Sequence, residues 1–349
     1  MVNTSYSKIY GISKYILKNP KAAKRVHSLM KQARPGNRNA GLLYFGVFIE
    51  NLIQLEGYGI NVKLYNRNSI KLSGWPYLRH ELTIEGASPN ELLNLVVLVR
   101  LSVKYGVAIY QSAVDEQAVP LKTVVIDTKK KIVTVDGNIN FHLDAIDPWI
   151  IMETFYLNIH NFGNIKNMKV VDVGAAFGDS ALYFAKHGAK VYAIEPVNYD
   201  AMIRNLKLNP HLSKKISPLR YAVGADGKLR FSVLSNMVDG GASAFSMHQG
   251  DSTVEVDGYT FRSLLDKLGI NAIEIAKFDC KGCEHRLTKE DLVRVKRYVS
   301  IEYGCSALGE LEHLTNLLKE SGFEYSVYLH SPEAISLIQN HATILAKRS

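Results

Sequence analysis

Two stretches of the chain combine acidic and small residues in patterns that are typical of ligand-binding or catalytic sites. In the first, residues 171–180 (VDVGAAFGDS), an apolar run ends in a turn of small residues and a helical pattern then begins. Small residues let a ligand approach the backbone, and a helix N-terminus offers free N–H groups. In the second, residues 277–284 (KFDCKGCE), acids and lysines follow another apolar run. The first stretch is typical of a nucleotide-type cofactor site, and the second offers groups for proton transfer.

The turn in the first stretch indicates which cofactor is expected. A short apolar run, residues 190–194, leads to Glu195. A carboxylate at this point can accept hydrogen bonds from two ribose hydroxyls. A dinucleotide site needs G-x-G-x-x-G, whereas the glycines here are only Gly174 and Gly178, and the turn ends on Asp179. A carboxylate at that point repels a pyrophosphate but tolerates a cation. We therefore expect S-adenosylmethionine (SAM) rather than NAD; the remaining alternative is a turn that packs without a ligand.

Charge is distributed unevenly along the chain. The 349 residues carry a formal charge of +9, and residues 1–49 contain no Asp or Glu but nine Lys and Arg residues. Residues 1–40 therefore predict a basic N-terminal arm, either solvated or in contact with an anionic partner such as nucleic acid, a phosphorylated glycan or a membrane surface. The rest of the chain is neutral by count. A hydrophobic content of 47% and a charged content of 21% are typical of a soluble globular protein.

The cysteines indicate a compartment rather than a site. Cys280, Cys283 and Cys305 are the only cysteines, and three cannot form a complete set of disulfides. A reducing, cytoplasmic setting is the simplest interpretation. Cys-x-x-Cys with a third cysteine and a histidine could bind zinc, but no second Cys-x-x-Cys exists. We expect packed thiols and no metal. No signal peptide is recognisable, and the apolar run at residues 92–101 is too short to span a membrane.

Periodicity divides the remaining chain into two regions. Residues 41–145 predict an accessory α+β region, with a helix at 42–55, strands at 60–65 and 80–84, and a hairpin at 123–127 and 131–135. Ser88, Pro89 and Glu91 form a helix-start pattern with a capping box, and that helix is expected to reach Lys104. Residues 146–349 predict a second domain in which strands and helices alternate, which indicates an α/β fold with a doubly wound, mostly parallel sheet.

The sequence pattern predicts the following strands and helices in this domain. The expected strands are 168–173, 190–194, 218–223, 228–233 (paired locally), 272–278, 297–302, 324–328 and 343–346. The expected helices are 149–162, 179–187, 199–208, 261–268, 284–296 and 308–321, with a long loop at 234–252.

The motifs resemble those of one family. Residues 171–180, Glu195-Pro196, the helix end at 205–209 and residues 221–224 are similar to class I SAM-dependent methyltransferases, and most similar to the FkbM type. Residues 277–284 resemble that family's second signature, K-I-D-x-E-G-x-E, and residues 300–302 its later Ile-Glu. The resemblance covers residues 149–349 and implies a seven-stranded, Rossmann-like sheet. Lys281 departs from it, because the family has Glu there; Ala176 and Phe177 fill a turn where many methyltransferases have a further Gly.

Ligands of doubly wound sheets lie outside the carboxyl ends of the strands, near the switch in strand order. There we expect backbone access to the methionine part of SAM, acids for its amino group, Glu195 on the ribose, Asn198 at the ribose or adenine edge, and apolar contact with adenine. The expected cofactor-binding residues are Asp172, Gly174, Ala175, Gly178, Asp179, Glu195, Asn198, Ala222 and Val223. For Asp172, an acid that only stabilises the turn is the alternative.

Methyl transfer needs an aligned nucleophile and, for a hydroxyl acceptor, a base that removes its proton. Asp279, Glu284 and Glu302 lie at or near neighbouring strand ends and are expected to converge and to raise one another's pKa. Lys281 either offsets their repulsion, binds an anionic acceptor, or is a solvated loop lysine. His285 is a second candidate base, although a lone histidine after a turn is more often structural.

The resemblance implies a methyltransferase that modifies a hydroxyl on a sugar or glycan-like acceptor. One alternative is an RNA or protein methyltransferase guided by the basic arm. Another is a non-catalytic SAM-binding or scaffold protein, which the missing acid at Lys281 favours. A NAD-dependent reductase is the weakest option.

Overall fold

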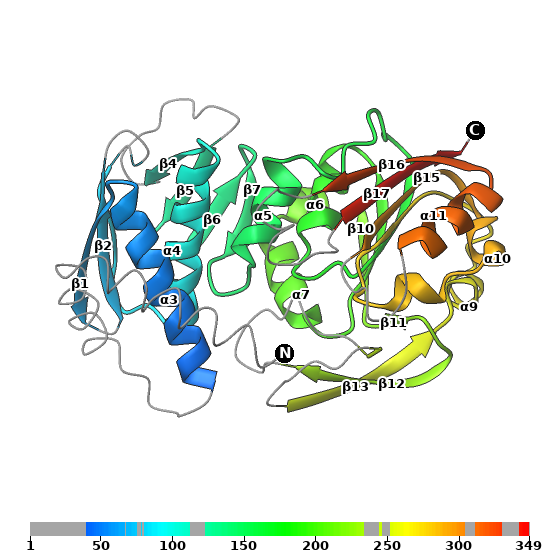
Figure 1. The fold of residues 1–349 in the computed structure, drawn as a ribbon, viewed down its shortest axis with the longest axis horizontal. Helices are drawn as coiled ribbons and strands as arrows, with labels where there is room; N and C mark the ends of the chain where they lie inside the picture. The colour runs from blue at the N-terminus through cyan, green and yellow to red at the C-terminus, as the bar shows by residue number, and fades with distance from the viewer. Residues whose placement is uncertain are drawn as a thin grey trace. The chain divides into compact units, whose positions relative to one another are not determined.

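The computed structural model describes residues 40–66, 68–74, 78, 80–111, 123–233, 244–245, 252–303, 311–329 and 342–348. The expected basic arm, apart from Ala40, lies outside these residues, as do Cys305 and most of the expected loop at 234–252. The chain divides into two compact units, Met1–Met152 and Glu153–Ser349, and each is described by itself (Figure 1). Among the described residues, no helix combines the length and apolar character needed to cross a membrane.

The N-terminal unit packs two helices with two small sheets. Helix α3 (Ala40–Gly57) leads to an antiparallel sheet of β1 (Asn61–Asn66), β2 (Ser69–Ser73) and β3 (Leu82–Ile84). Helix α4 (Pro89–Lys104) packs against α3 and carries the expected capping box: Ser88 Oγ accepts from Glu91 N–H, and the Glu91 carboxylate accepts from Ser88 N–H. The prediction of this helix start is confirmed.

The second small sheet has the order β4-β5-β6-β7. Its strands are β4 (Ala108–Gln111), β5 (Thr123–Asp127), β6 (Ile132–Val135) and β7 (Ile139–His142). Strands β5 and β6 pair antiparallel, which confirms the predicted hairpin, whereas β4 pairs parallel with β5. Strands β2, β4 and β7 were not expected from the sequence.

The C-terminal unit is organised around one seven-stranded sheet. Its order is β10-β9-β8-β14-β15-β17-β16, with β8 (Lys169–Val173), β9 (Lys190–Ile194), β10 (Ile216–Leu219), β14 (Ile273–Phe278), β15 (Val295–Tyr303), β16 (Phe323–Leu329) and β17 (Ala342–Arg348). The pairs from β10 to β15 are parallel, and β17 is antiparallel to both of its neighbours. The predicted doubly wound, mostly parallel sheet is confirmed.

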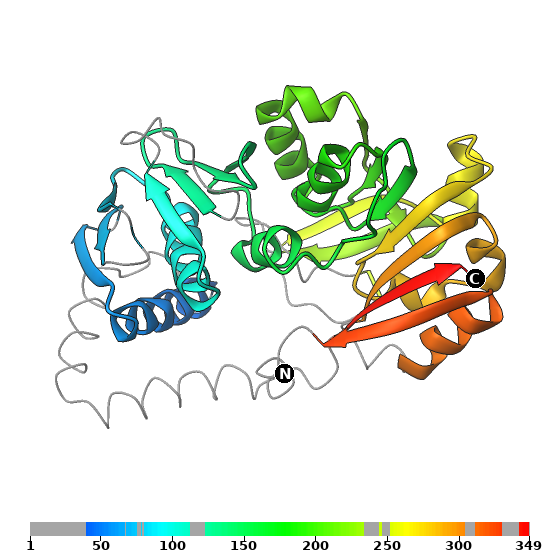
Figure 2. The ribbon, with the colours of Figure 1, turned by 90° about the horizontal axis from the view of Figure 1, so that it is seen from above.

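Helices cover both faces of this sheet (Figures 1 and 2). They are α6 (Asp179–Lys186), α7 (Tyr199–Leu208), α8 (Pro210–Ser213), α9 (Phe261–Lys267), the 3₁₀-helix η1 (Cys283–Arg286), α10 (Lys289–Leu292) and α11 (Leu311–Glu320). Helix α5 (Pro148–Phe155) precedes them in the chain and crosses the boundary between the two units. Helix α6 packs on β8, β9 and β10. Buried side chains of α9, α10 and α11 form one apolar cluster with β14, β15 and β17. The order of the strands reverses between β8 and β14, so the carboxyl ends of these two strands mark the expected ligand edge.

Two predicted helices are shorter than expected. The predicted helix at 284–296 is wrong: η1 ends at Arg286, Leu287 is extended, and Thr288 caps the separate helix α10 through a capping box with Asp291. Strand β15 then begins at Val295, because the apolar residues from there pack into the sheet core. The predicted helix at 149–162 ends at Phe155.

The predicted strand at 218–223 is split between two sheets. Its first part is β10, at the edge of the seven-stranded sheet. Its last two residues form β11 (Ala222–Val223), which pairs with β13 (Ser252–Tyr259) in a separate sheet with β12 (Gly227–Val233). The pairing partner of β12 is therefore β13, which was not expected from the sequence. In Figure 1 the separate sheet β11-β13-β12 lies below the seven-stranded sheet.

Candidate functional site

The turn after β8 requires glycine at its first position. Gly174 has a φ of +75°, and a Cβ there would overlap the carbonyl oxygen of Asp279, which follows the neighbouring strand β14. The two turns are therefore in backbone contact. Gly178 has a φ of 91° and is the N-cap of α6. Ala175 between them is fully buried. These residues bring the turn close to the carboxyl end of β14, where the second expected group of residues lies.

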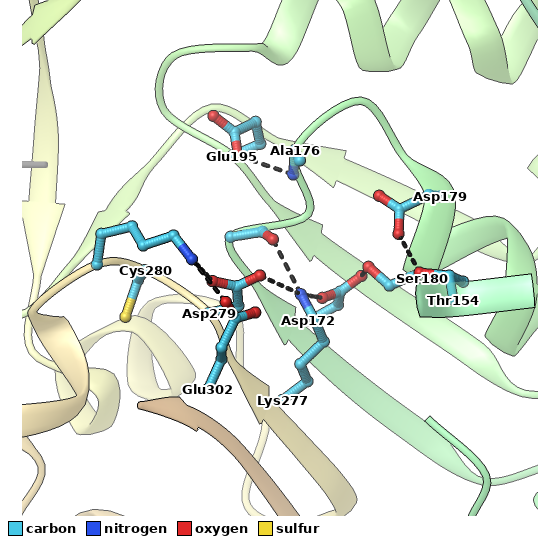
Figure 3. A network of polar contacts seen from close by, with 12 residues as sticks. Thr154, Asp172, Ala176, Asp179, Ser180, Glu195, Lys277, Asp279, Cys280 and Glu302 are labelled. Carbon is cyan, nitrogen blue, oxygen red and sulfur yellow. Dashed lines mark hydrogen bonds and ion pairs between the residues drawn. The ribbon is translucent and has the colours of Figure 1, made fainter. Parts of the chain in front are cut away.

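A buried ion pair joins β8 and β14 under this turn (Figure 3). Lys277 Nζ lies 3.0 Å from Asp172 Oδ1 and donates to the carbonyl oxygen of Gly174 at 3.0 Å. The other oxygen of Asp172 accepts from Ser180 Oγ at 2.7 Å. Burial lowers the pKa of Lys277, but the charges of Asp172, Asp279 and Asp179 outweigh it and raise that pKa. Lys277 thus stays charged and neutralises Asp172.

Sequence reasoning did not select Lys277 as a site residue. A signal was present, because Lys277 is the one charged residue in the last three positions of an otherwise apolar strand end, Ala276–Phe278. In the parallel pairing of β14 with β8, Lys277 stands opposite Asp172, so both side chains share one face of the sheet. The pairing of the strands, which is a tertiary feature, gives this lysine its role.

Asp179 is a second buried acid, at the first turn of α6. Its exposure is 2%, and Thr154 Oγ1 donates to Oδ2 at 2.7 Å. Burial raises the pKa of Asp179 to about 7, although Lys277 and Thr154 lower it. Figure 3 shows Asp179 and Thr154 beside Ser180, apart from the Asp172–Lys277 pair. Asp179 is therefore a carboxyl that changes its charge near neutral pH.

Glu195 at the end of β9 is held by backbone N–H groups. Oε1 accepts from Val197 and Asn198, both at 2.8 Å, and Oε2 accepts from Ala176 at 2.9 Å. Burial raises the pKa of Glu195 to about 7, against the effect of these three N–H donors. Asn198, which begins α7, contributes its backbone N–H to this arrangement. The carboxylate of Glu195 therefore ties the turn after β8 to the turn after β9.

Ala222 and Val223 are buried in β11. They belong to the small sheet with β12 and β13 rather than to the seven-stranded sheet. Val223 is part of the apolar cluster that also contains Phe278 and Cys283.

The second expected group of residues meets across the ends of β14 and β15. Lys281 Nζ lies 2.9 Å from Asp279 Oδ1 and 2.8 Å from Glu302 Oε1. Burial lowers the pKa of Lys281, but the charges of Asp279 and Glu302 raise it above its ordinary value. Burial and the charge of Glu302 raise the pKa of Asp279 to about 6. Lys281 therefore lies between the two carboxylates, where its charge lowers the pKa of Asp279.

Glu284 lies in η1, one turn beyond these groups. Its Oε2 accepts from Gly282 N–H at 2.8 Å and lies 3.2 Å from Cys280 Sγ. Burial raises the pKa of Glu284 to about 7, with Asp279 adding to the effect and Lys281 opposing it. The neighbouring His285 has a pKa lowered by burial, and its Nε2 is 3.9 Å from Glu284 Oε1. Among the described contacts, Glu284 is tied to the loop between Cys280 and Cys283 rather than to Glu302.

Cys280 and Cys283 form a disulfide. The expectation that they are packed thiols is therefore wrong. Lys281 and Gly282 have φ values of 54° and 128°, and this tight turn brings the two cysteine Cα atoms to 5.5 Å, a separation that suits a disulfide.

Residues 172–325 match the profile of the methyltransferase FkbM domain family. A search of curated proteins found no match. Solved structures with similar backbones include TYW2 from M. jannaschii in complex with AdoMet, with 15% identity, a TM-score of 0.36, and coverage of 65% of this chain and 92% of that one.

Two further similar structures are a precorrin-6y C5,15-methyltransferase from Geobacter metallireducens (10% identity, TM-score 0.34, coverage 55% and 86%) and magnesium protoporphyrin IX methyltransferase from Synechocystis PCC 6803 with bound SAM (12%, 0.32, 58% and 79%). At these identities and TM-scores, the fold assignment rests on the strand order of the seven-stranded sheet and on the family match.

Proposed function

Because the chain carries an FkbM methyltransferase domain at residues 172–325, we propose that it transfers a methyl group from SAM to a hydroxyl group of a sugar or glycan-like acceptor. The observation that carries this proposal is the meeting of Asp279, Lys281 and Glu302 at the strand ends beside the glycine turn after β8. A hydroxyl acceptor needs a base beside the methyl group, and this cluster supplies carboxylates for that task.

The residues of the β8 and β9 turns fit SAM. The amino group and sulfonium of SAM are positive, and Asp172, Asp179 and Asp279 surround Lys277 so closely that all three raise its pKa. A carboxylate has about four acceptor positions, and Glu195 uses three of them for N–H groups, one of these on Oε2. One position on Oε2 is thus left for a ribose hydroxyl. No phosphate-binding glycine pattern competes with this assignment.

In this proposal each group of residues has one task. Gly174, Ala175 and Gly178 admit the methionine part to the backbone, and Asp179 binds the amino group, with Asp172 positioned through Lys277. Asn198 helps Glu195 at the ribose, and Ala222 and Val223 line the adenine side. Asp179, Glu195 and Asn198 are buried, so water is kept away from their hydrogen bonds with the cofactor, which strengthens those bonds.

SAM supplies a methyl group that is electrophilic because it is bonded to a sulfonium. Asp279 is the proposed base, because its pKa of about 6 leaves it ionised at pH 7 yet more basic than an ordinary carboxylate. Glu302 raises that pKa, and Lys281 keeps the two carboxylates together. Glu284 supports the loop that carries Lys281.

The first experiment is a calorimetric titration of the full chain with S-adenosylhomocysteine and with SAM. We expect micromolar binding that Glu195→Ala abolishes. The carboxylate of Glu195 connects the two turns and, in this proposal, accepts a hydrogen bond from a ribose hydroxyl. Glu290→Ala, at an exposed acid on α10, is the matched control and should bind normally. Heat from neither ligand, with a folded wild-type protein, would overturn the proposal.

The second experiment follows a labelled methyl group from SAM into sugars, RNA and protein. We expect transfer to a sugar hydroxyl, and a 10²–10⁴-fold lower rate in Asp279→Asn with unchanged S-adenosylhomocysteine affinity. Transfer to RNA that falls steeply with salt would support the alternative guided by the basic arm, residues 1–40. Binding of SAM with no transfer to any of these acceptors would support the scaffold alternative.

A further inference from the structure

The disulfide between Cys280 and Cys283 lies directly beside the proposed acceptor site. Cys280 follows Asp279, and the two residues that the disulfide encloses are Lys281 and Gly282. We propose that Cys280 and Cys283 form a reversible dithiol–disulfide site, reduced by a dithiol reductant, whose redox state holds or releases Lys281 between Asp279 and Glu302. This site goes beyond methyl transfer, and its redox chemistry does not require that transfer.

The two sulfurs differ in accessibility. Cys283 is 1% exposed and belongs to the apolar cluster of α9, α10 and α11, whereas Cys280 is only partly buried at the margin of that cluster. Thiol–disulfide exchange requires in-line attack of a thiolate on one sulfur. The sulfur of Cys280 is therefore the point of attack, and the sulfur of Cys283 is the leaving group.

The exchange balances with one dithiol. One thiolate of the reductant attacks Cys280 Sγ, the Cys280–Cys283 bond breaks, and Cys283 leaves as a thiolate that takes up a proton. The second thiolate of the reductant then attacks the reductant's own sulfur in the mixed disulfide, which releases Cys280. Two electrons pass from the reductant to the cysteine pair, the reductant becomes a disulfide, and its two protons are matched by those that Cys280 and Cys283 gain. An oxidised dithiol reverses each step.

A buried acid stands at the sulfur that is released last. Glu284 Oε2 lies 3.2 Å from Cys280 Sγ, and the same oxygen accepts from Gly282 N–H at 2.8 Å. In the disulfide, Cys280 has no proton to donate to this oxygen, whereas the reduced thiol has one. Glu284 can therefore supply a proton to the departing thiolate and then accept a hydrogen bond from the thiol, which favours the reduced form.

The enclosed residues explain how the redox state reaches the site. Lys281 has a φ of 54°, a left-handed conformation that is unfavourable for a residue with a Cβ. The disulfide holds the ends of the turn together and so maintains this conformation, in which Nζ contacts Asp279 and Glu302. Reduction removes the covalent restraint. Lys281 is then free to relax away from the two carboxylates, which changes the charge that an acceptor meets.

The test counts thiols in the full chain with Cys305→Ser, so that only the pair remains. The protein is equilibrated with reduced and oxidised dithiothreitol at several ratios, its thiols are trapped with N-ethylmaleimide, and the intact mass is measured. We expect no adducts under oxidising ratios and two under reducing ratios, appearing together in the folded protein and reversed by oxidised dithiothreitol. Labelling only after addition of denaturant, or labelling that does not reverse, would overturn the proposal.

Two variants test the role of Glu284 and the link to Lys281. For half of the Cys280–Cys283 disulfide to be reduced, Glu284→Gln should require at least a tenfold higher ratio of reduced to oxidised dithiol than the wild type, which corresponds to about 30 mV. Glu290→Gln should require the same ratio as the wild type. Hydrogen exchange of the peptide 279–286 should quicken at least tenfold on reduction and in Cys280→Ser, while that of the peptide 169–180 stays constant. An unchanged ratio or unchanged exchange would overturn the corresponding part. Thiol counts do not use SAM, so failure of S-adenosylhomocysteine binding is distinguishable from failure here.

Discussion

The turns after β8 and β14 lie side by side at the same edge of the sheet, yet they are built in different ways. The turn after β8 is held by backbone contacts: Gly174 N–H and Ala175 N–H both donate to Ile194 O, and Gly174 touches Asp279. The turn after β14 is held by side chains, namely the Lys281 contacts and a disulfide. In the proposed function, the cofactor site is thus fixed mainly by the backbone, whereas the acceptor site is built from side chains.

Lys277 connects the two turns. Its Nζ lies 3.0 Å from Asp172 under the first turn and 4.0 Å from Asp279 at the start of the second (Figure 3). Its exposure is 4%, so the charges of this pair are separated from water. Substitutions at Lys277, in the turn after β8 (the backbone turn) and in the turn after β14 (the side-chain turn) should therefore have different effects.

The largest effect is expected at the connection. Lys277→Met leaves the buried carboxylate of Asp172 without its cation, and breaking a buried ion pair costs about 3–5 kcal/mol. Urea unfolding should show this loss in the free energy of unfolding, and Lys190→Met, at an exposed lysine at the start of β9, should show almost none. A loss below about 1 kcal/mol would mean that the two turns do not depend on Lys277.

The backbone turn is tested by a pair of glycines with nearly equal φ. Gly174 (φ +75°) meets the Asp279 carbonyl, whereas a Cβ on Gly163 (φ +73°) meets nothing within 4 Å. Gly163→Ala should cost about 1–2 kcal/mol for the left-handed conformation alone. Gly174→Ala should cost about 1–3 kcal/mol more for the overlap and should weaken S-adenosylhomocysteine binding. Equal losses of stability in the two variants would contradict close contact between the turns.

The acid that begins α6 predicts a pH dependence of stability. The pKa of Asp179 is raised from 3.8 to about 7 in the folded protein, so between these values the folded state binds more protons than the unfolded state. The contribution of Asp179 to stability therefore falls as the pH rises through this window and is constant above it.

Asp179→Asn removes this dependence. Relative to wild type, the free energy of unfolding of the variant should increase by about 2 kcal/mol between pH 5.5 and pH 8, since each pKa unit is worth 1.36 kcal/mol. Asp200→Asn, in the first turn of α7 at an exposed position, is the control and should show a constant difference. A constant difference for Asp179→Asn as well would mean that this carboxyl does not titrate near neutral pH.

The smallest effect on stability is expected in the side-chain turn. Lys281→Met removes a partly exposed cation, and its loss should change the free energy of unfolding by about 1 kcal/mol or less. The pKa of Asp279 should then rise, because Lys281 lowers it. The pH at which the methyl-transfer rate rises should therefore increase by about one pH unit. Lys289→Met, at an exposed lysine in α10, should leave the profile unchanged.

Features that depend on neighbours along the chain could be predicted from the sequence. The alternation of strand and helix patterns along residues 146–349 predicts the doubly wound sheet, and the capping box at Ser88 and Glu91 predicts the start of α4, because each element is recognised from residues adjacent in the chain. The sequence also shows that small residues and acids follow β8, and that an acid ends β9. The domain boundaries and the roles of the site residues remain predictions.

Which of these residues meet depends on how the strands are paired in the folded protein. Lys277 neutralises Asp172 because β14 pairs with β8, although the two residues are 105 positions apart in the chain. Lys281 bridges Asp279 and Glu302 because β15 is the next strand, and sequence spacing does not state the order of strands. The disulfide required two successive left-handed residues, and helix η1 stopped where Leu287 became extended. Long-range pairing and local backbone conformation are fixed by packing, which a single sequence records only indirectly.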